Sequence, residues 1–206
     1  MSFTRINLVV KPPQDVLKQA IQISSNISKE ADTFFVLDGV NFFPHITIYS
    51  PEYPSHNLDK VYKKVEEIAF HTKPFIATFT SFNAHLGYVD IELEKTIEWE
   101  NLHEVFVHKL NPFRENHIRE KYKFPEELRL YSELQQKYIL DYGYSEIFTA
   151  FRPHLTITRL KDKEMAKEVV KKLQFVIHSF EVNTLAAYLM GNNGTCIRLI
   201  REFALK

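Results

Sequence analysis

The chain of 206 residues has apolar and charged fractions typical of a globular protein, and its 26 Lys and Arg side chains equal its 26 Asp and Glu side chains in number. The resulting net charge of zero excludes the broad positive field of a protein that coats duplex nucleic acid. Cys196 is the only cysteine, so an internal disulfide is excluded and a cysteine-based zinc site is not expected.

Location is predicted from two further features. Residues 1–10 lack the apolar core and small-residue cleavage site of a signal peptide, and no segment approaches the ~20 apolar residues of a membrane-spanning helix. We therefore expect a cytoplasmic protein that does not enter a membrane. The length fits one domain over residues 1–206, and we expect a monomer.

In chain order, hydrophobic periodicity first predicts a strand over residues 3–10, ended by Pro12-Pro13, and then a helix over residues 16–27. A short strand is predicted over residues 34–37 and a turn at Asp38-Gly39. The chain therefore begins with a β-α-β order.

The rest of the pattern contains one order of elements twice. A strand over 43–50 precedes a helix over 58–69 and strands over 75–82 and 86–93, and a strand over 151–160 precedes a helix over 165–173 and strands over 175–182, 185–190 and 196–203. Between the copies, helices are predicted over 102–110 and 126–141, with Gly143 placed to end the second one. The connection from Asn111 to Pro125 is predicted to be a solvated loop, although its basic side chains would also suit a substrate lid.

The two repeated strands carry matching residues. Phe43-Pro44-His45-Ile46-Thr47-Ile48 aligns with Arg152-Pro153-His154-Leu155-Thr156-Ile157, and none of the other seven histidines has this context. Such an internal duplication predicts an α+β protein with two pseudo-symmetric lobes. We expect antiparallel sheets around a central cleft, with the helices on the outside.

Side chains alternate across a strand, so the polar residues of each motif share one face. In the first strand these are His45, Thr47 and Tyr49, and in the second they are His154, Thr156 and Thr158, with Arg159 on the opposite side. We predict that the two histidines and the first threonine of each strand are catalytic. Tyr49 and Thr158 are predicted as further substrate contacts.

Two imidazoles on opposite sides of one phosphorus can divide acid–base catalysis, because histidine titrates near pH ~6.5 and both of its forms are accessible. A threonine hydroxyl two residues away can donate to a phosphoryl oxygen. Such a site requires no metal ion and no cofactor. Zinc is the rival occupant of a two-histidine site, but neither motif adds a cysteine or carboxylate, and threonine is a poor zinc ligand.

At these residues the sequence resembles the 2H phosphoesterase superfamily, which includes bacterial 2′-5′ RNA ligase-like proteins and cyclic nucleotide phosphodiesterases. The superfamily signature is a pair of His-x-Thr/Ser-x motifs, matched here by residues 45–48 and 154–157. The resemblance covers nearly the whole chain. It implies a bilobal fold with these residues lining the cleft, and metal-independent hydrolysis of cyclic phosphates or handling of 2′-5′ linkages. A looser resemblance over residues 113–154 is to a branch associated with phosphonate utilisation, from which Pro153 departs.

The function favoured by these features is hydrolysis of a 2′,3′-cyclic or related ribose cyclic phosphodiester, with a cyclic nucleotide or ribose phosphate as the substrate. RNA end processing or 2′-5′ joining would use the same site, with Tyr49, Tyr53 and Tyr88 available to stack on bases. The non-enzymatic alternative is a module that binds a nucleotide without turnover. The sequence leaves open the substrate size, its base, the ester bond that breaks, and which histidine is the acid.

Overall fold

A computed structural model describes residues 2–206 of the chain as an α+β protein built on antiparallel strands. The strands are β1 (Phe3–Val10), β2 (Thr33–Val36), β3 (Ile46–Tyr49), β4 (Glu52–Pro54), β5 (Phe75–His85), β6 (Tyr88–Leu93), β7 (His154–Leu160), β8 (Ser179–Val182), β9 (Thr184–Met190) and β10 (Cys196–Ala204). Eight of them run edge to edge in the order β10-β9-β1-β3-β7-β6-β5-β8, while β2 pairs with β7 and β4 pairs with β1. The predicted fold class is confirmed.

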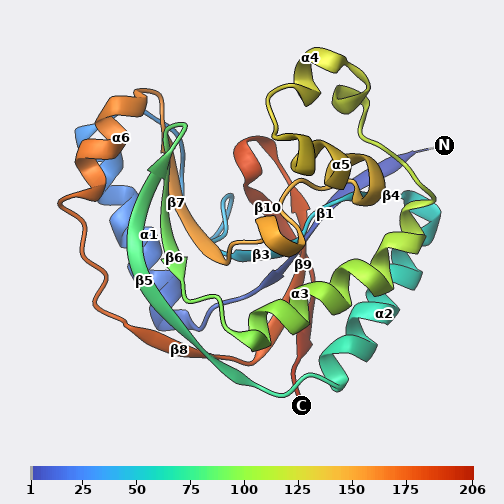
Figure 1. Cartoon of the computed structure of the whole chain (residues 1–206). Helices are drawn as coiled ribbons and strands as arrows, with labels where there is room; N and C mark the ends of the chain where they lie inside the picture. The colour runs from blue at the N-terminus through green and yellow to red at the C-terminus, as the bar shows by residue number, and fades with distance from the viewer. Residues whose placement is uncertain (1) are drawn as a thin grey trace.

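The sheet is curled, and helices cover the outside of its two lobes (Figure 1). In one lobe, α2 (Leu58–Phe70) packs against β10 and α3 (Ile97–Leu110) packs against β3. In the other lobe, α1 (Gln14–Glu30) packs against β7 and α6 (Lys163–Val170) packs against β5, β6 and β7. Over residues 2–206, no helix combines the length and the apolar character needed to cross a membrane.

The two lobes do not coincide with the two copies of the sequence repeat. β5 and β6 follow β3 and α2 along the chain, yet β6 pairs with β7. β9 follows β7 and α6, yet it pairs with β1. The first copy therefore places β5 and β6 in the other lobe, and the second copy does the same with β9 and β10, while β8 stays beside β5. This exchange leaves the two motif strands, β3 and β7, next to each other in the middle of the sheet.

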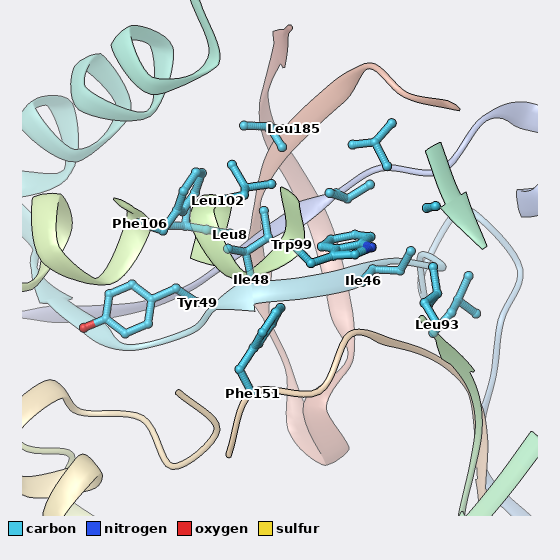
Figure 2. Packing of buried hydrophobic residues seen from close by; sticks show 14 of the residues in the cluster. Leu8, Ile46, Ile48, Tyr49, Leu93, Trp99, Leu102, Phe106, Phe151 and Leu185 are labelled. Atoms are coloured by element: carbon cyan, nitrogen blue, oxygen red, sulfur yellow. The ribbon is translucent and has the colours of Figure 1, made fainter. Parts of the chain in front are cut away.

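The apolar residues of the motif strands hold them in this position. Ile46 and Ile48 are fully buried against α3, whose Trp99, Leu102 and Phe106 pack over them (Figure 2). Leu155 and Ile157 of β7 are also fully buried. Burial of each such side chain contributes roughly 1.5–3 kcal/mol, so the core fixes both strands while their polar residues face the other way.

The segment between the copies differs from the prediction. Instead of one helix over 126–141, there are two, α4 (Pro125–Leu128) and α5 (Glu133–Tyr142). Ser132 caps α5 through its hydroxyl, which accepts from the Gln135 N–H, while the Gln135 side chain accepts from the Ser132 N–H. Gly143, at φ 74°, ends α5 as predicted.

The connection from Asn111 to Pro125 is not a plain solvated loop. Arg114 is buried, and its guanidinium donates to the Asn111 side chain at 2.6 Å, to the Asp141 carbonyl at 3.0 Å, and to the His117 carbonyl. These bonds tie the connection to the end of α5. The loop prediction is wrong for this segment because one buried arginine organises it.

Candidate active site

The two motifs meet where β3 pairs with β7. Their aliphatic residues, Ile46 and Leu155, are partners in antiparallel register. One residue further in either direction, this alignment places His45 across from Thr156 and the other histidine, His154, across from the threonine of the first motif. Each histidine therefore lies beside the threonine of the other motif, around a local two-fold axis.

Both histidine rings are held in the same way. The Nδ1 atom of His45 is 2.7 Å from the carbonyl oxygen of Phe43, and the Nδ1 atom of His154 is 2.7 Å from the carbonyl oxygen of Arg152. A carbonyl oxygen only accepts hydrogen bonds, so each Nδ1 must carry the donated proton. In the neutral ring, Nε2 is then the basic atom. The proline inside each motif favours an extended backbone at the residue that supplies the carbonyl.

The two histidines differ in burial. His45 is 7% exposed, whereas His154 is only partly buried. Burial lowers the pKa of His45 to about 4, the positive charge of His154 acts in the same direction, and the carbonyl groups of Phe43 and Gly194 oppose it. At neutral pH, His45 is therefore a neutral imidazole with a basic Nε2, the state that a general base requires.

The two threonines have different partners. The hydroxyl of Thr47 accepts from the Asn7 amide at 3.0 Å, which leaves its own hydrogen free to donate. The hydroxyl of Thr156 instead donates to the Asp90 carboxylate at 2.6 Å. Asn7 and Asp90 lie on β1 and β6, the strands that flank the motif strands. The side chains thus break the symmetry of the backbone, and Thr47 is the threonine whose hydrogen is free to donate.

The predicted substrate contacts at Tyr49 and Thr158 are corrected by the structure. Tyr49 is fully buried and donates its hydroxyl to the Tyr142 carbonyl at 2.6 Å, pointing away from the apolar cluster (Figure 2). Thr158 is also fully buried and donates to the Phe35 carbonyl at 2.6 Å. Both hydroxyls link segments of the fold, so neither is available to a substrate.

A β-bulge explains why Thr158 turns inward. Tyr88 and Asp90 of β6 are paired with Arg159 and Thr156 of β7, so β7 contains one extra residue in this stretch. The extra residue reverses the alternation of side chains. As a result Arg159, rather than Thr158, shares the face of Thr156, and the predicted orientation of Arg159 is wrong.

Arg159 is a candidate functional residue that the sequence pattern missed. Its Nη1 donates to the Asn193 side chain at 2.7 Å, and its guanidinium carbon lies 4.7 Å from the ring centre of Tyr88 and 4.9 Å from that of Phe34. Its Nε is buried without a hydrogen-bond partner in the described part of the chain. Asn193 is the neighbour of Gly194, whose carbonyl acts on His45. Arg159 therefore brings a positive charge to the site.

Neither a thiol nucleophile nor a metal-binding cluster accompanies the histidines in residues 2–206. Cys196 lies beside the first motif, where its Sγ accepts from the Asn7 amide at 3.4 Å, but burial raises the pKa of the thiol and keeps it protonated. The structure groups no three His, Cys, Asp or Glu side chains in a way that would hold a metal ion, within that same range. The groups available for chemistry are thus the two imidazoles, the two hydroxyls and the Arg159 guanidinium.

The fold and the paired motifs define a bilobal α+β protein with a His-x-Thr sequence at the start of each of two adjacent central strands, where His45 immediately precedes β3 and His154 is the first residue of β7. The family model described as the 2′-5′ RNA ligase superfamily matches residues 38–193. The chain belongs to this superfamily, as its sequence motifs indicated.

Solved structures with the same fold cover nearly the whole chain. E. coli LigT in apo form has a TM-score of 0.59 at 10% identity, over 100% of this chain and 99% of that chain. The protein TT0787 of Thermus thermophilus has a TM-score of 0.60 at 14% identity, over 98% of this chain and 97% of that chain. At these identities the likeness concerns the fold alone. Among curated protein sequences, no match is found.

Proposed function

We propose that this protein is a metal-independent phosphoesterase that hydrolyses a 2′,3′-cyclic or related ribose cyclic phosphodiester. The proposal rests on the two imidazoles, each held through Nδ1 by a backbone carbonyl, and on the register that places each histidine opposite the threonine of the other motif. Superfamily membership supports a phosphoesterase-type site. The crystal structures of E. coli LigT with phosphate and with 3′-AMP support a substrate of nucleotide type.

In the proposed reaction, a water molecule attacks the phosphorus of the cyclic diester. His45, which is neutral, takes a proton from the water at Nε2 as the new P–O bond forms. The bond from phosphorus to one ribose oxygen breaks, and that oxygen receives the Nε2 proton of a protonated His154. The product is a phosphate monoester with a free ribose hydroxyl. Each proton transfer is typically worth ~10²–10⁴-fold in rate.

Two further groups are proposed to hold the non-bridging phosphoryl oxygens. Thr47 has a free hydroxyl hydrogen, and Arg159 has a positive charge and lies on the same face of β7 as Thr156. Both would stabilise the negative charge that develops on these oxygens. We propose that Thr156 is oriented by Asp90 and donates to the substrate only if its hydroxyl turns away from that carboxylate.

The alternative of RNA stacking loses two of its three aromatic candidates. Tyr49 and Tyr53 are both fully buried, and Tyr88 carries Arg159 over its ring. This observation favours recognition through phosphate contacts over recognition through stacked bases.

The proposal is tested by turnover of a panel of nucleoside 2′,3′-cyclic phosphates and a ribose 1,2-cyclic phosphate, with a metal chelator present. The double variant His45→Ala/His154→Ala, purified in parallel, controls for contaminating phosphodiesterases. We expect chelator-resistant ring opening by the wild-type protein and none by the double variant. A nucleotide that binds but is recovered unchanged would reject catalysis in favour of a binding module.

A further inference from the structure

Arg5 lies next to the candidate active site on β1. It is two residues before Asn7, whose amide bonds to Thr47, and β1 keeps one register from Arg5, opposite Glu52 of β4, to Leu8, opposite Tyr49 of β3. Alternate residues of a strand share a face and are ~6.7 Å apart. Arg5 therefore shares the face of Asn7, one strand repeat away from the threonine that is proposed to hold the substrate phosphate.

The natural ion-pair partner of Arg5 is bonded to other groups. Glu52 lies directly opposite Arg5 in the antiparallel pairing of β1 with β4. Its Oε1 accepts from the Arg119 Nε at 3.0 Å, and its Oε2 is 3.0 Å from the His117 Nε2. In the described part of the chain, the Arg5 side chain has no ion pair, and its Nε is buried without a hydrogen-bond partner.

An arginine in this position carries a charge that no ion pair within the described residues neutralises. Guanidinium groups stay protonated in proteins, and a partly buried charge without a partner is costly. Burial lowers the pKa of Arg5, and the charge of Arg119 adds to this effect, while Tyr122, Tyr144 and Glu52 oppose it. A bound anion would pair with the guanidinium charge of Arg5 and offset the repulsion from Arg119.

The charge of Arg5 also acts on groups outside β1 and β4. Burial raises the pKa of Tyr88 on β6, and the charges of both Arg159 and Arg5 oppose this rise. The charge of Arg5 also acts on Cys196, beside the first motif. The two unpaired arginines, one from each lobe, are thus both within electrostatic reach of the Tyr88 hydroxyl.

We propose that Arg5, with Arg119 beside it, binds a second phosphate group of the substrate, next to the cyclic phosphate that the histidines act on. The proposal rests on the proposed function, because it specifies what else the substrate must carry. The second phosphate can be a terminal monoester on a small nucleotide or a phosphodiester of a longer strand. Both present the anionic oxygens that match the planar fork of a guanidinium.

The test compares three substrates: a nucleoside 2′,3′-cyclic phosphate, the same compound with a 5′-phosphate, and a dinucleotide that ends in a 2′,3′-cyclic phosphate. We expect the wild-type protein to show higher kcat/KM when a second phosphate is present. Arg5→Gln is expected to reduce this preference by about ten- to a hundredfold. The exposed Arg198, changed to Gln, is the matched control and should keep the preference. Preference for the 5′-phosphate identifies a monoester, and preference for the dinucleotide identifies a strand.

A binding measurement separates this proposal from the proposed function. Calorimetric titration compares a nucleoside 3′-monophosphate with a nucleoside 3′,5′-bisphosphate and a dinucleotide 3′-phosphate, in the wild type, Arg5→Gln and Arg5→Lys. Tighter binding of a ligand with a second phosphate, lost in Arg5→Gln and partly kept in Arg5→Lys, supports the subsite even without turnover. Affinity that is the same with and without the second phosphate, or that is unaffected by both variants, overturns the subsite even if cyclic phosphates are hydrolysed.

Discussion

The hydroxyl of Thr156 donates to the carboxylate of Asp90 at 2.6 Å, so its hydrogen points toward β6 rather than toward the space between the motifs. Asp90 is only 3% exposed, and Arg152 is its other neighbour, at 3.4 Å. Thr47, the counterpart of Thr156 in the first motif, accepts from Asn7 instead. Two threonines at matching sequence positions therefore have different tasks.

This difference predicts separate effects of Thr47→Val and Thr156→Val. Thr47→Val removes the free donor and is expected to lower kcat/KM about ten- to a hundredfold. Thr156→Val leaves the buried Asp90 carboxylate without that donor and is expected to lower the free energy of unfolding by about 1–3 kcal/mol, with the smaller loss of kcat/KM. Steady-state kinetics and urea unfolding measure the two quantities. Equal kinetic losses in both variants would contradict the assignment.

Arg159 is expected to contribute to substrate binding through its charge. Arg159→Gln should lower kcat/KM for a cyclic phosphate about ten- to a hundredfold, since a charged hydrogen bond to the phosphoryl group is lost. Lys161 lies just beyond the end of β7, is exposed, and pairs with Asp32 at 3.7 Å, so Lys161→Gln is the matched control. Kinetics of both variants decide the question. A kcat/KM equal to that of the wild type in Arg159→Gln would contradict a role of Arg159 in substrate binding.

The pH dependence of activity should reflect the burial of His45. Because its pKa is lowered to about 4, the base form of His45 persists well below neutral pH. The acid limb of kcat/KM is therefore expected near pH 4, whereas an unperturbed histidine would place it near ~6.5. A pH–rate profile checks this, with circular dichroism at each pH to confirm that the protein remains folded. An acid limb near the unperturbed value would mean that His45 is not the base.

The free energy of unfolding should also decrease as the pH is lowered, because two buried histidines are neutral in the folded protein. His103 donates from Nδ1 to the Ile48 carbonyl and accepts at Nε2 from the Phe148 N–H, and burial lowers its pKa to about 4, as it does for His45. A folded-state pKa below the unfolded value of ~6.5 means that the unfolded chain binds protons first as the pH falls. The stabilisation is thus complete above pH ~6.5 and is lost as the pH falls toward about 4, by up to roughly 3 kcal/mol for each histidine.

Urea unfolding at neutral pH and at about pH 5 measures this loss. We expect the wild-type protein to be less stable at the lower pH. His103→Asn should be less stable than wild type at neutral pH and should show a smaller decrease on acidification. The exposed His71, changed to Asn, should reproduce the wild-type dependence on pH. Wild-type stability that does not change between the two values would contradict the account.

Much of the fold could be predicted because the local hydrophobic pattern of the sequence indicates where its strands and helices lie. The alternation around His45 and His154 placed both motifs on strands, and the duplication indicated two lobes. The exchange of strands between the lobes could not be predicted, because periodicity shows which face of a strand is apolar but not which strand is its neighbour.

The site could be predicted as far as regular alternation holds. The bulge in β7 has no signal in the sequence. Because of it, Arg159 rather than Thr158 lies on the same face of the strand as Thr156. The unpaired state of Arg5 depends on Glu52 being bonded to Arg119, a residue far away in sequence. Tyr49 departs from the predicted alternation in the same way, because the register shift between β1 and β3 leaves one extra residue between Thr47 and Tyr49 and turns Tyr49 into the core. There its hydroxyl donates to the Tyr142 carbonyl.

The most direct test of the central claim is to measure kcat of His45→Ala, His154→Ala and the double variant on a nucleoside 2′,3′-cyclic phosphate, with a chelator present and His71→Ala as the control. If the two imidazoles act as one acid–base pair, each single variant should lose ~10²–10⁴-fold or more, and the double variant should lose far less than the product of the two. Turnover near the wild-type rate in either single variant, with the fold intact, would contradict the two-histidine mechanism.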